Sequence, residues 1–478
     1  MDLKRLFYPE SIAVVGASPN FGGGKMPYYQ VLKGIGYQGR LYPVNPKYIE
    51  LNGVKVYASL DDLPEPVDLA IVSVPVKRAL ETIKAAARKG IRYVHFFTAG
   101  FGEIGEKELE AEMMQARGNT RILGPNCLGV HCTASRIIFD PSFHQTEDGK
   151  AAFLGQSGGI TSNFVRMAQS RYIPINKVVS YGNQIDLRVE DFIAYLGRDD
   201  TVSVIAAYIE DIKDGLGFMN ALKLATLKKP VVILKGGITE QGARAAASHT
   251  GAIAGAHNIW SAVMRQHRCI QVDTFEQLLN VVMLATSEKI PTGPRLGFLG
   301  AGGGTSVLFT DLAHLNGLSL PELNAATQAG IAKRISKINT CTMNPVDLGA
   351  YGFDFTIMAH TMQLMDRDEN IDVIIPYFSL DFISIFQNAQ IESGPHTIVE
   401  AAKHLRKPVI PIFSRFTEDD LHLEDVRIKI FSILRKAGLP VYNTIQDCIH
   451  SIREMLQWSL KPQDDSASCR MSQMSEQA

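Results

Sequence analysis

The chain has 478 residues, of which 46% are hydrophobic and 20% are charged, a composition typical of globular proteins. At this length about three domains are expected, since single cores rarely exceed roughly 200 residues. Its 48 Lys and Arg residues balance 49 Asp and Glu residues, which excludes the broad charged field of proteins that bind nucleic acid or anionic membranes. Any anionic ligand is therefore expected to be held by local groups.

Apolar runs alternate with helix-like segments over residues 1–130. The predicted strands are SIAVVGAS, GRLYPVNP, LAIVSVP, YVHFFTAGF and TRILGPN. This alternation predicts a parallel sheet with crossover helices, which is an α/β fold. Each run ends in Gly, Pro, Ser or Asn, so the ligand-binding loops are expected at the carboxyl ends of the strands.

The loop after the first strand reads AVVGASPNFGGGKM and precedes a helix, a position where backbone N–H groups bind phosphate. The dinucleotide fingerprint that starts at Gly16 is broken, because Ser18 and Phe21 stand at its other two glycine positions. After the second strand, Lys47 occupies the place of the usual ribose-binding acid, and a cation there suits a phosphorylated ribose. Coenzyme A fits this pattern better than NAD. NADP, or an ordinary turn beside a surface lysine, remains an alternative.

The rest of the chain contains a repeat. Residues 150–289 form a second alternating block, IPTGPR resembles a linker, and residues 293–460 form a third block. The paired segments are GQSGGITSNF with GAGGGTSVLF, NQIDL with NPVDL, TVSVIAAYIEDI with NIDVIIPYFSLDF, and KKPVVILKGGITE with RKPVIPIFSRFTE. We therefore expect two homologous α/β domains. Residues 461–478 form a polar tail to which no structure is assigned.

One difference separates the two copies. Only the second block continues into ARAAASHTGAIAG, where His249 is surrounded by small residues that let other groups approach its ring. A phosphorylated imidazole needs an acid that fixes its tautomer, backbone donors for the phosphate, and shelter from water. A polar surface histidine is the ordinary alternative.

The groups that such an imidazole needs are present in the sequence. Glu210 ends the predicted strand VSVIAAYIE and is the candidate acid, although a solvated loop carboxylate is the alternative. The candidate phosphate donors precede two predicted helices, whose N-termini favour anions; they are Ser157, Gly158 and Gly159 in the second block and Gly302, Gly303 and Gly304 in the third. Two such termini facing His249 would hold one phosphate.

The six cysteines are scattered without a CxxC pair; they are Cys127, Cys132, Cys269, Cys341, Cys448 and Cys469. No apolar run reaches the roughly 20 residues of a membrane span, and the first residues carry no basic end followed by a long apolar run. We therefore expect reduced thiols in a cytoplasmic protein that does not enter a membrane.

Several motifs together resemble one family. VVGAS, VNPK, FTAGFGE, GPNCLG, SGG, YIED and SHTG occur in the order found in the NDP-forming acyl-CoA synthetases, which are similar to the α subunit of succinyl-CoA synthetase. The similarity extends from residue 1 to about residue 460, and the third block resembles the C-terminal ligase domain of that family. The arrangement resembles the α subunit of an ADP-forming acetate–CoA ligase. It implies a Rossmann-like CoA-binding domain followed by two flavodoxin-like ligase domains.

The resemblance also implies roles for individual residues. The coenzyme A site would be lined by Gly16, Ser18, Pro19, Lys47, Val74, Pro75, Thr98, Ala99, Gly100 and Asn126. His249 would be the phosphohistidine and Glu210 its orienting partner. The implied reaction converts acyl-CoA, phosphate and ADP reversibly into a carboxylic acid, CoA and ATP, with Mg²⁺ accompanying the nucleotide.

Two departures limit what the resemblance implies. Ser162 or Asn163 stands where succinyl-CoA synthetase has a tyrosine, so the contacts to succinate are not expected. The third block has GAGGG where many relatives have Gly-Gly-Pro-Gly.

The sequence also lacks the family's ATP-grasp domain and any Walker-type loop. A separate ATP-grasp β subunit, in an α₂β₂ assembly, is therefore expected to bind the nucleotide.

The sequence leaves two alternative functions. One is a CoA-binding regulatory or scaffold protein without turnover, against which the intact SHTG motif and Glu210 argue. The other is an NADP-dependent oxidoreductase. Lys47 and the broken fingerprint argue against it, as does the lack of a plausible site for hydride transfer.

Overall fold

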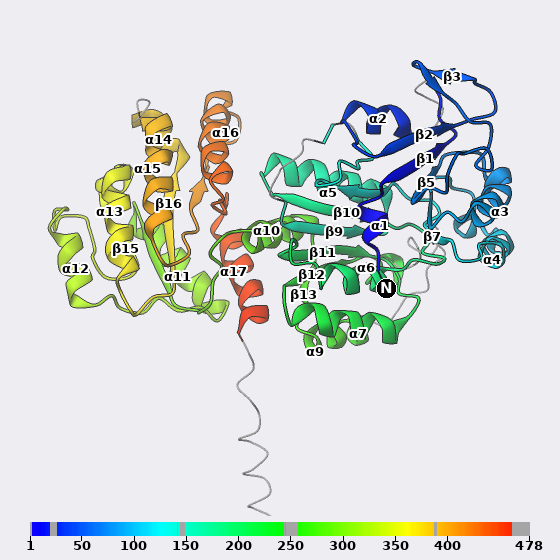
Figure 1. Cartoon of the computed structure of the whole chain (residues 1–478). Helices are drawn as coiled ribbons and strands as arrows, with labels where there is room; N and C mark the ends of the chain where they lie inside the picture. Colours follow the sequence, from blue (N-terminus) through cyan, green and yellow to red (C-terminus); the bar gives the residue numbers. More distant parts are fainter. Residues whose placement is uncertain are drawn as a thin grey trace, which may run out of the picture. The chain divides into compact units, whose positions relative to one another are not determined.

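The computed structural model describes residues 2–19, 26–140, 142–143, 149–242, 244, 257–386 and 390–460 (Figure 1). By its internal contacts the chain divides into two units, Met1–Thr286 and Ser287–Ala478. Within the described residues, no helix is both long enough and apolar enough to cross a membrane. The cysteines that lie in this part of the chain are free thiols: Cys127, Cys132, Cys269, Cys341 and Cys448.

The first unit begins with a five-stranded parallel sheet in the order β2-β1-β5-β6-β7. Its strands are β1 (Ser11–Val15), β2 (Arg40–Val44), β5 (Leu69–Val72), β6 (Tyr93–Phe96) and β7 (Arg121–Leu123). β5 and β6 are buried along their whole length, as expected for parallel strands with both faces covered. The predicted alternation of strands and crossover helices is confirmed.

Short helices and one hairpin complete this first sheet. The helices are α1 (Lys4–Phe7), α2 (Tyr28–Gly34), α3 (Ala79–Lys89) and α4 (Lys107–Ala116), with the 3₁₀ turns η1 (Val76–Arg78) and η2 (Gly102–Ile104). The hairpin pairs β3 (Glu50–Leu51) with β4 (Val54–Lys55), and its turn residues Asn52 and Gly53 both have positive φ. The apolar sides of α3 and α4 bury Ile83 and Met113 in the core of this sheet.

The first unit contains a second sheet in the order β13-β12-β11-β9-β10-β8. Its strands are β8 (Gly129–Cys132), β9 (Ala151–Gly155), β10 (Ile175–Ser180), β11 (Val204–Ile209), β12 (Val231–Lys235) and β13 (Ile270–Val272). Only β8 runs antiparallel, against β10. The expected first-domain boundary at residue 130 therefore falls inside a strand of the second sheet. The helices are α5 (Gly158–Ser170), α6 (Val189–Leu196), α7 (Gly215–Thr226), α9 (His257–Gln266) and α10 (Phe275–Ala285).

The second unit is built on a four-stranded parallel sheet in the order β15-β14-β16-β17. Its strands are β14 (Leu296–Gly300), β15 (Val346–Asp347), β16 (Val373–Ser379) and β17 (Ile412–Ser414). The helical elements are α11 (Gly303–Leu315), α12 (Ala325–Ala332), η3 (Gly349–Phe353), α13 (Phe355–Asp366), α14 (Leu380–Phe386), α15 (Gln390–His404), α16 (Leu421–Lys436) and α17 (Ile445–Ser459).

The sheet of the second unit repeats part of the preceding sheet. The strand order β17-β16-β14-β15 is equivalent to β12-β11-β9-β10. In both sheets a glycine-rich loop follows the central strand, β9 or β14, and leads into a helix, α5 or α11. The repeated order of motifs in the sequence thus corresponds to a repeated strand order.

Candidate functional site

The carboxyl ends of β1, β2 and β5 surround a groove of about 350 Å³ in the first unit. The groove is lined by five residues expected at the coenzyme A site: Gly16, Ser18, Lys47, Val74 and Pro75. Pro19, Thr98, Ala99, Gly100 and Asn126 do not line it. The structure therefore brings together the residues that follow three neighbouring strands, as expected for an open parallel sheet.

Gly16 lets the loop after β1 approach the loop after β5. Its φ is +93°, and a Cβ at this position would lie 2.3 Å from the carbonyl oxygen of Ser73. Any other residue would meet both the steric cost of positive φ and this collision. Asn45 holds the same loop by donating from Nδ2 to the carbonyl of Ala17 at 2.8 Å. The loop after β1 is therefore held close to the backbone of Ser73. This leaves the groove at the strand ends open to a ligand.

Two cations, Lys47 and Arg78, border the groove without an ion-pair partner among the described residues. The backbone N–H of Lys47 donates to Oδ1 of Asn45 at 3.0 Å, which fixes the position of its backbone beside the loop. A third arginine, Arg88, also lines the groove but pairs with Asp61 at 2.7 Å. Lys47 and Arg78 are thus the cations available to a phosphate.

Arg78 and Asn45 were missed by sequence reasoning. Arg78 stands at the N-terminus of α3, where the helix dipole disfavours a cation. That misplaced charge in the segment VPVKRAL was the available signal for an anion site. Asn45 gave no comparable signal, because its role depends on the path of the loop after β1.

The remaining residues expected at the coenzyme A site form a neighbouring set of loops. Thr98 donates from Oγ1 to the carbonyl of Val74 at 2.6 Å, and Asn126 donates its N–H to the carbonyl of Thr98 at 2.9 Å. Asn126 itself has a φ of +58°. Hydrogen bonds therefore connect the loops after β5, β6 and β7 in sequence.

A second set of polar groups lies at the carboxyl ends of β9, β11 and β12. Ser157 caps α5 by accepting from the N–H of Ile160 at 3.4 Å, and the glycines Gly158 and Gly159 begin the helix. Gln156 accepts on Oε1 from the N–H groups of Glu210 at 2.8 Å and Asp211 at 3.1 Å. The loop that begins α5 is thereby tied to the end of β11.

Glu210 is buried, with only 8% of its surface exposed, and within the described part of the chain its Oε2 atom has no hydrogen-bond partner. The Tyr208 hydroxyl and the Glu210 side chain both border Gly236, where a Cβ would lie 2.6 Å from Oη and 3.3 Å from Cγ. Burial and, secondarily, the neighbouring Glu210 carboxylate raise the pKa of Tyr208. A buried acid with one oxygen free needs a partner that these groups do not supply.

Lys235 is another residue that sequence reasoning missed. Its ammonium donates to the carbonyl of Glu210 at 2.7 Å and to that of Gly236, and it lies 5.6 Å from the centre of the Trp260 ring. Burial lowers the pKa of Lys235, opposed by Asp211 and Glu210. Lys235 therefore links the end of β11 to the start of the segment that leads toward His249.

His249 lies outside the described residues. The described chain enters its segment from β12, which pairs with β11 so that Ile209 is opposite Lys235. The pairing of His249 with Glu210 consequently stays a prediction.

The glycines expected to bind phosphate in the second unit, Gly302, Gly303 and Gly304, begin α11. Gly302 is the N-cap, with a φ of +106°, and its N–H donates to Oδ1 of Asp347 at 3.0 Å. One of the expected phosphate donors is therefore already engaged by a carboxylate. A Cβ at Gly304 would meet nothing within 4 Å.

Comparison with known proteins assigns domains to the first unit. Residues 10–133 match a family model described as a CoA binding domain, and residues 148–285 match one described as a succinyl-CoA ligase like flavodoxin domain. The first range contains the first sheet together with β8 of the second sheet, and the second range contains the other five strands of the second sheet.

Whole-chain relatives have related names. The α subunit of acetate–CoA ligase [ADP-forming] II from Pyrococcus furiosus is 34% identical over 93% of this chain and 95% of its own length. Acetate–CoA ligase [ADP-forming] I from Archaeoglobus fulgidus is 33% identical over 86% of this chain and 61% of its own length. The structure of dinucleotide forming acetyl-coenzyme A synthetase 1 from Ca. Korarchaeum cryptofilum, in complex with phosphate and ADP, superposes with a TM-score of 0.86 at 28% identity, covering 100% of this chain and 99% of that chain.

Proposed function

Because the chain belongs to the family of ADP-forming acetate–CoA ligase α subunits, we propose that it binds an acyl-CoA and relays a phosphoryl group through His249. The coenzyme A moiety would lie at the first sheet and the phosphohistidine at the second. The observation that carries the proposal is the buried Glu210 carboxylate, which belongs to the same ligase domain as the SHTG motif. Its Oε2 has no hydrogen-bond partner among the residues described.

The proposed reaction has three steps. A phosphate oxygen attacks the thioester carbonyl, the C–S bond breaks, and CoA leaves as a thiol after protonation. A nitrogen of His249 then attacks the phosphorus of the acyl phosphate, and the carboxylate leaves. In the last step a terminal oxygen of ADP attacks the phosphohistidine to form ATP and restore the imidazole. Each step is reversible.

Glu210 would hold the imidazole in the tautomer that presents a free nitrogen to phosphorus. Carboxylate–imidazole pairs of this kind fix ring orientation and stabilise the positive charge that develops on the ring. The N–H groups from Ser157 to Gly159 lie at the N-terminus of α5, where the helix dipole would stabilise a bound phosphate. Gly303 and Gly304 remain candidates for a second donor set.

Coenzyme A would occupy the groove beside Gly16. Its pyrophosphate would meet the loop after β1, while Lys47 or Arg78 would neutralise the 3′-phosphate. The proposal keeps Ser18, Val74 and Pro75 as groove contacts. Pro19 would contact the rest of the ligand from the loop after β1. Thr98, Ala99, Gly100 and Asn126 would contact it from the loops after β6 and β7, which hydrogen bonds connect to the loop after β5.

The nucleotide is assigned to a partner, an ATP-grasp β subunit in an α₂β₂ assembly. Relatives are named as α subunits, and this chain spans 61% of the Archaeoglobus relative, whose remaining length has room for such a domain. Mg²⁺ would accompany the nucleotide on that partner, where it would neutralise phosphate charge. In the described part of this chain no three His, Cys, Asp or Glu side chains converge as metal ligands. The acid would be acetate or a related carboxylic acid.

The direct test is phosphohistidine formation. The purified chain is mixed with acetyl-CoA or an aryl-acyl-CoA, ³²P-phosphate and the ATP-grasp subunit encoded beside it. Acid-labile, base-stable label is expected on the wild type and on His404→Asn, whose histidine is exposed on α15. The label should be absent from His249→Asn. If the wild type never labels with any acyl-CoA or partner, the relay is wrong, and CoA binding without label would favour a regulatory scaffold.

A further inference from the structure

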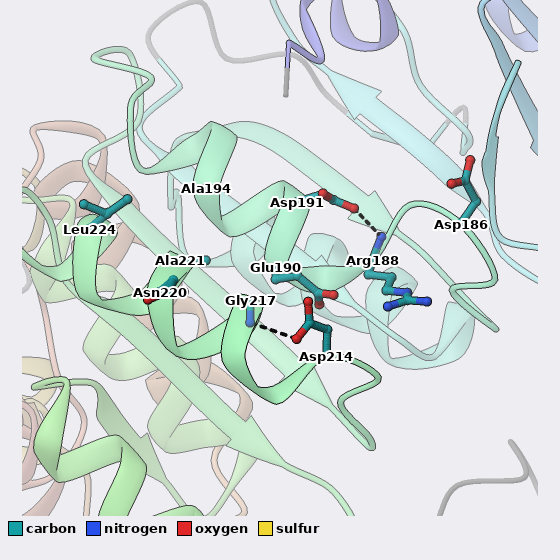
Figure 2. Close-up of a pocket in the computed structure, with 10 residues that line it drawn as sticks. All are labelled: Asp186, Arg188, Glu190, Asp191, Ala194, Asp214, Gly217, Asn220, Ala221 and Leu224. Atoms are coloured by element: carbon teal, nitrogen blue, oxygen red, sulfur yellow. Dashed lines mark hydrogen bonds between the residues drawn. The ribbon is translucent and has the colours of Figure 1, made fainter. Parts of the chain in front are cut away.

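A separate cavity of about 340 Å³ opens between α6 and α7 of the first unit (Figure 2). It shares no residue with the proposed coenzyme A and phosphate sites. Its polar lining residues are Asp186, Arg188, Glu190, Asp191, Asp214 and Asn220. Gly217, Ala194 and Ala221 leave the space between the helices open, and Leu224 borders it.

Glu190 is the unexplained group in this cavity. It is 8% exposed, and its buried Oε2 atom has no hydrogen-bond partner among the residues that the structure describes. Burial raises the pKa of Glu190 to about 7. A hydrogen bond from its backbone and the charge of Arg188 oppose this rise, whereas Asp191 on α6 and Asp214, the N-cap of α7, add to it. A desolvated carboxyl with an unused oxygen costs free energy unless a partner satisfies it.

The surroundings of Glu190 have a net negative charge. Asp191 accepts from the N–H of Arg188 at 3.0 Å, and Asp214 accepts from the N–H of Gly217 at 2.9 Å (Figure 2). Both carboxylates are therefore fixed at helix N-termini, and the Glu190 carboxyl lies beside that of Asp214 in the same view. Arg188 is the single cation that lines the cavity. A cationic side chain would complement this lining.

An apolar ridge on α7 runs beside the cavity. Leu216 is 71% exposed, Leu224 is 52% exposed, and Leu227, directly after the helix, is 73% exposed. Their spacing places them along one side of the helix, and Leu224 also lines the cavity. Exposed leucines beside a buried polar group are typical of a protein interface with an apolar centre.

We propose that α6 and α7 form the docking face for the partner subunit, which inserts a Lys or Arg side chain against Glu190 and covers Leu216, Leu224 and Leu227. The proposal rests on the proposed function for the existence of that subunit. The charge of the cavity favours a basic side chain, and the ridge favours a protein over a free cation. Pairing with the cation converts protonated Glu190 to the carboxylate, so docking releases a proton.

The test measures the Kd between the full chain and the purified ATP-grasp subunit at pH 6, 7 and 8. Because docking lowers the pKa of Glu190, affinity should rise with pH and level off above pH 7, by up to about tenfold per unit below it. Glu190→Gln should weaken binding and remove this pH dependence, while Leu216→Asp should weaken it at least about tenfold at every pH. Exposed controls, Glu112→Gln and Leu421→Asp, should bind like the wild type.

Four outcomes would overturn the docking face. The first is an ATP-grasp subunit that binds both test variants as tightly as the wild type, and the second is one that fails to bind the wild type. The third is a Leu216→Asp variant that changes only the oligomeric mass of the isolated chain, which would assign the ridge to a second copy. The fourth is a Glu190→Gln variant that keeps the wild-type pH dependence. If the wild-type chain docks through this face but His249 is never labelled, only the proposed function is contradicted.

Discussion

The two copies of the ligase scaffold differ at equivalent strand ends. In the first unit Tyr208 is opposite Leu234, and β11 and β12 lead to Glu210 and Lys235. In the second unit Tyr377 is opposite Ile412, so the same positions hold Ser379 and Phe413. A buried acid and a half-buried cation are thus replaced by a hydroxyl and an aromatic ring.

The replacement changes the chemistry without changing the sheet. Phe413 stacks on Phe378 with ring centres 4.5 Å apart, whereas the equivalent Lys235 donates to two carbonyls. Ala301 occupies the position of Gln156, which accepts from two backbone N–H groups in the first unit. The two copies therefore share a strand order but differ in the side chains at the strand ends, and under the proposed function only the first copy offers a carboxylate to a phosphorylated imidazole.

The largest expected effect is on the rate of His249 phosphorylation, when Glu210 of the first unit is replaced by the serine that stands at the equivalent position of the second unit. Glu210→Ser should lower the rate of His249 phosphorylation by at least about 10²-fold, because the imidazole loses its orienting acid. Single-turnover labelling with ³²P-phosphate measures the rate. The reciprocal change, Ser379→Glu, should leave the rate near that of the wild type, and equal losses in both variants would remove the functional distinction between the copies.

The next effect concerns the cation beside the coenzyme A groove. Lys47→Ala should weaken CoA binding about tenfold, or roughly 1.4 kcal/mol, because the 3′-phosphate loses a cation. Titration calorimetry with CoA and dephospho-CoA measures this, and dephospho-CoA should be affected much less. Lys333→Ala, at an exposed site in the second unit, is the control. Equal weakening of both ligands would count against the 3′-phosphate argument.

The two glycine loops should also respond differently to a methyl group. Gly302→Ala should destabilise the second unit by about 1–2 kcal/mol, since its φ of +106° is strained for any residue with a Cβ. Gly304→Ala, inside α11, should be neutral or stabilising by up to about 1 kcal/mol. Denaturant unfolding monitored in the second unit distinguishes the pair. Similar free energies of unfolding for both variants would contradict the assigned backbone geometry.

The smallest effect is a pH dependence of stability. Burial lowers the pKa of Lys235 in the folded chain below its ordinary value of 10.5. At pH values between the folded pKa and 10.5, the unfolded chain therefore binds more protons than the folded chain. The cost of burying the charge is therefore present below the folded pKa and is relieved as pH rises toward 10.5. The stability difference between wild type and Lys235→Met should shift in favour of the wild type over this range. Thermal unfolding at several pH values measures it, and a flat difference would contradict the effect of burial.

Sequence patterns predicted the scaffold because they reflect local chemistry. Apolar runs ending in Gly or Asn gave the parallel strands, and the repeated motif order corresponds to the repeated sheet. Glu210 could be proposed from the sequence because it ends the predicted strand VSVIAAYIE, at the same edge of the sheet as the loop that carries His249. The burial of Glu210 and the lack of a partner for Oε2 among the described residues were not predictable, because they depend on how the chain packs around the end of β11.

The groups that the sequence did not reveal act across strands or helices. Lys235 reaches Glu210 only through the register of β12 with β11, and Gln156 reaches it only through that of β9 with β11. β8 joins the second sheet by an antiparallel pairing that no local pattern marks. The Glu190 cavity likewise arises from the packing of α6 against α7. Such contacts follow from tertiary structure, so a single sequence carries little signal for them.

The close approach of Gly16 to Ser73 provides a criterion for distant sequences. With only 2.3 Å between a Cβ and the carbonyl oxygen, this position accepts glycine alone unless the whole loop moves. A diverged homologue that keeps glycine here can retain the close approach between the loops after β1 and β5, even if the residues equivalent to Lys47 and His249 differ. A homologue with another residue at this position must have a different path for the loop after β1. Such a homologue should be placed in a separate group before any ligand is assigned to it.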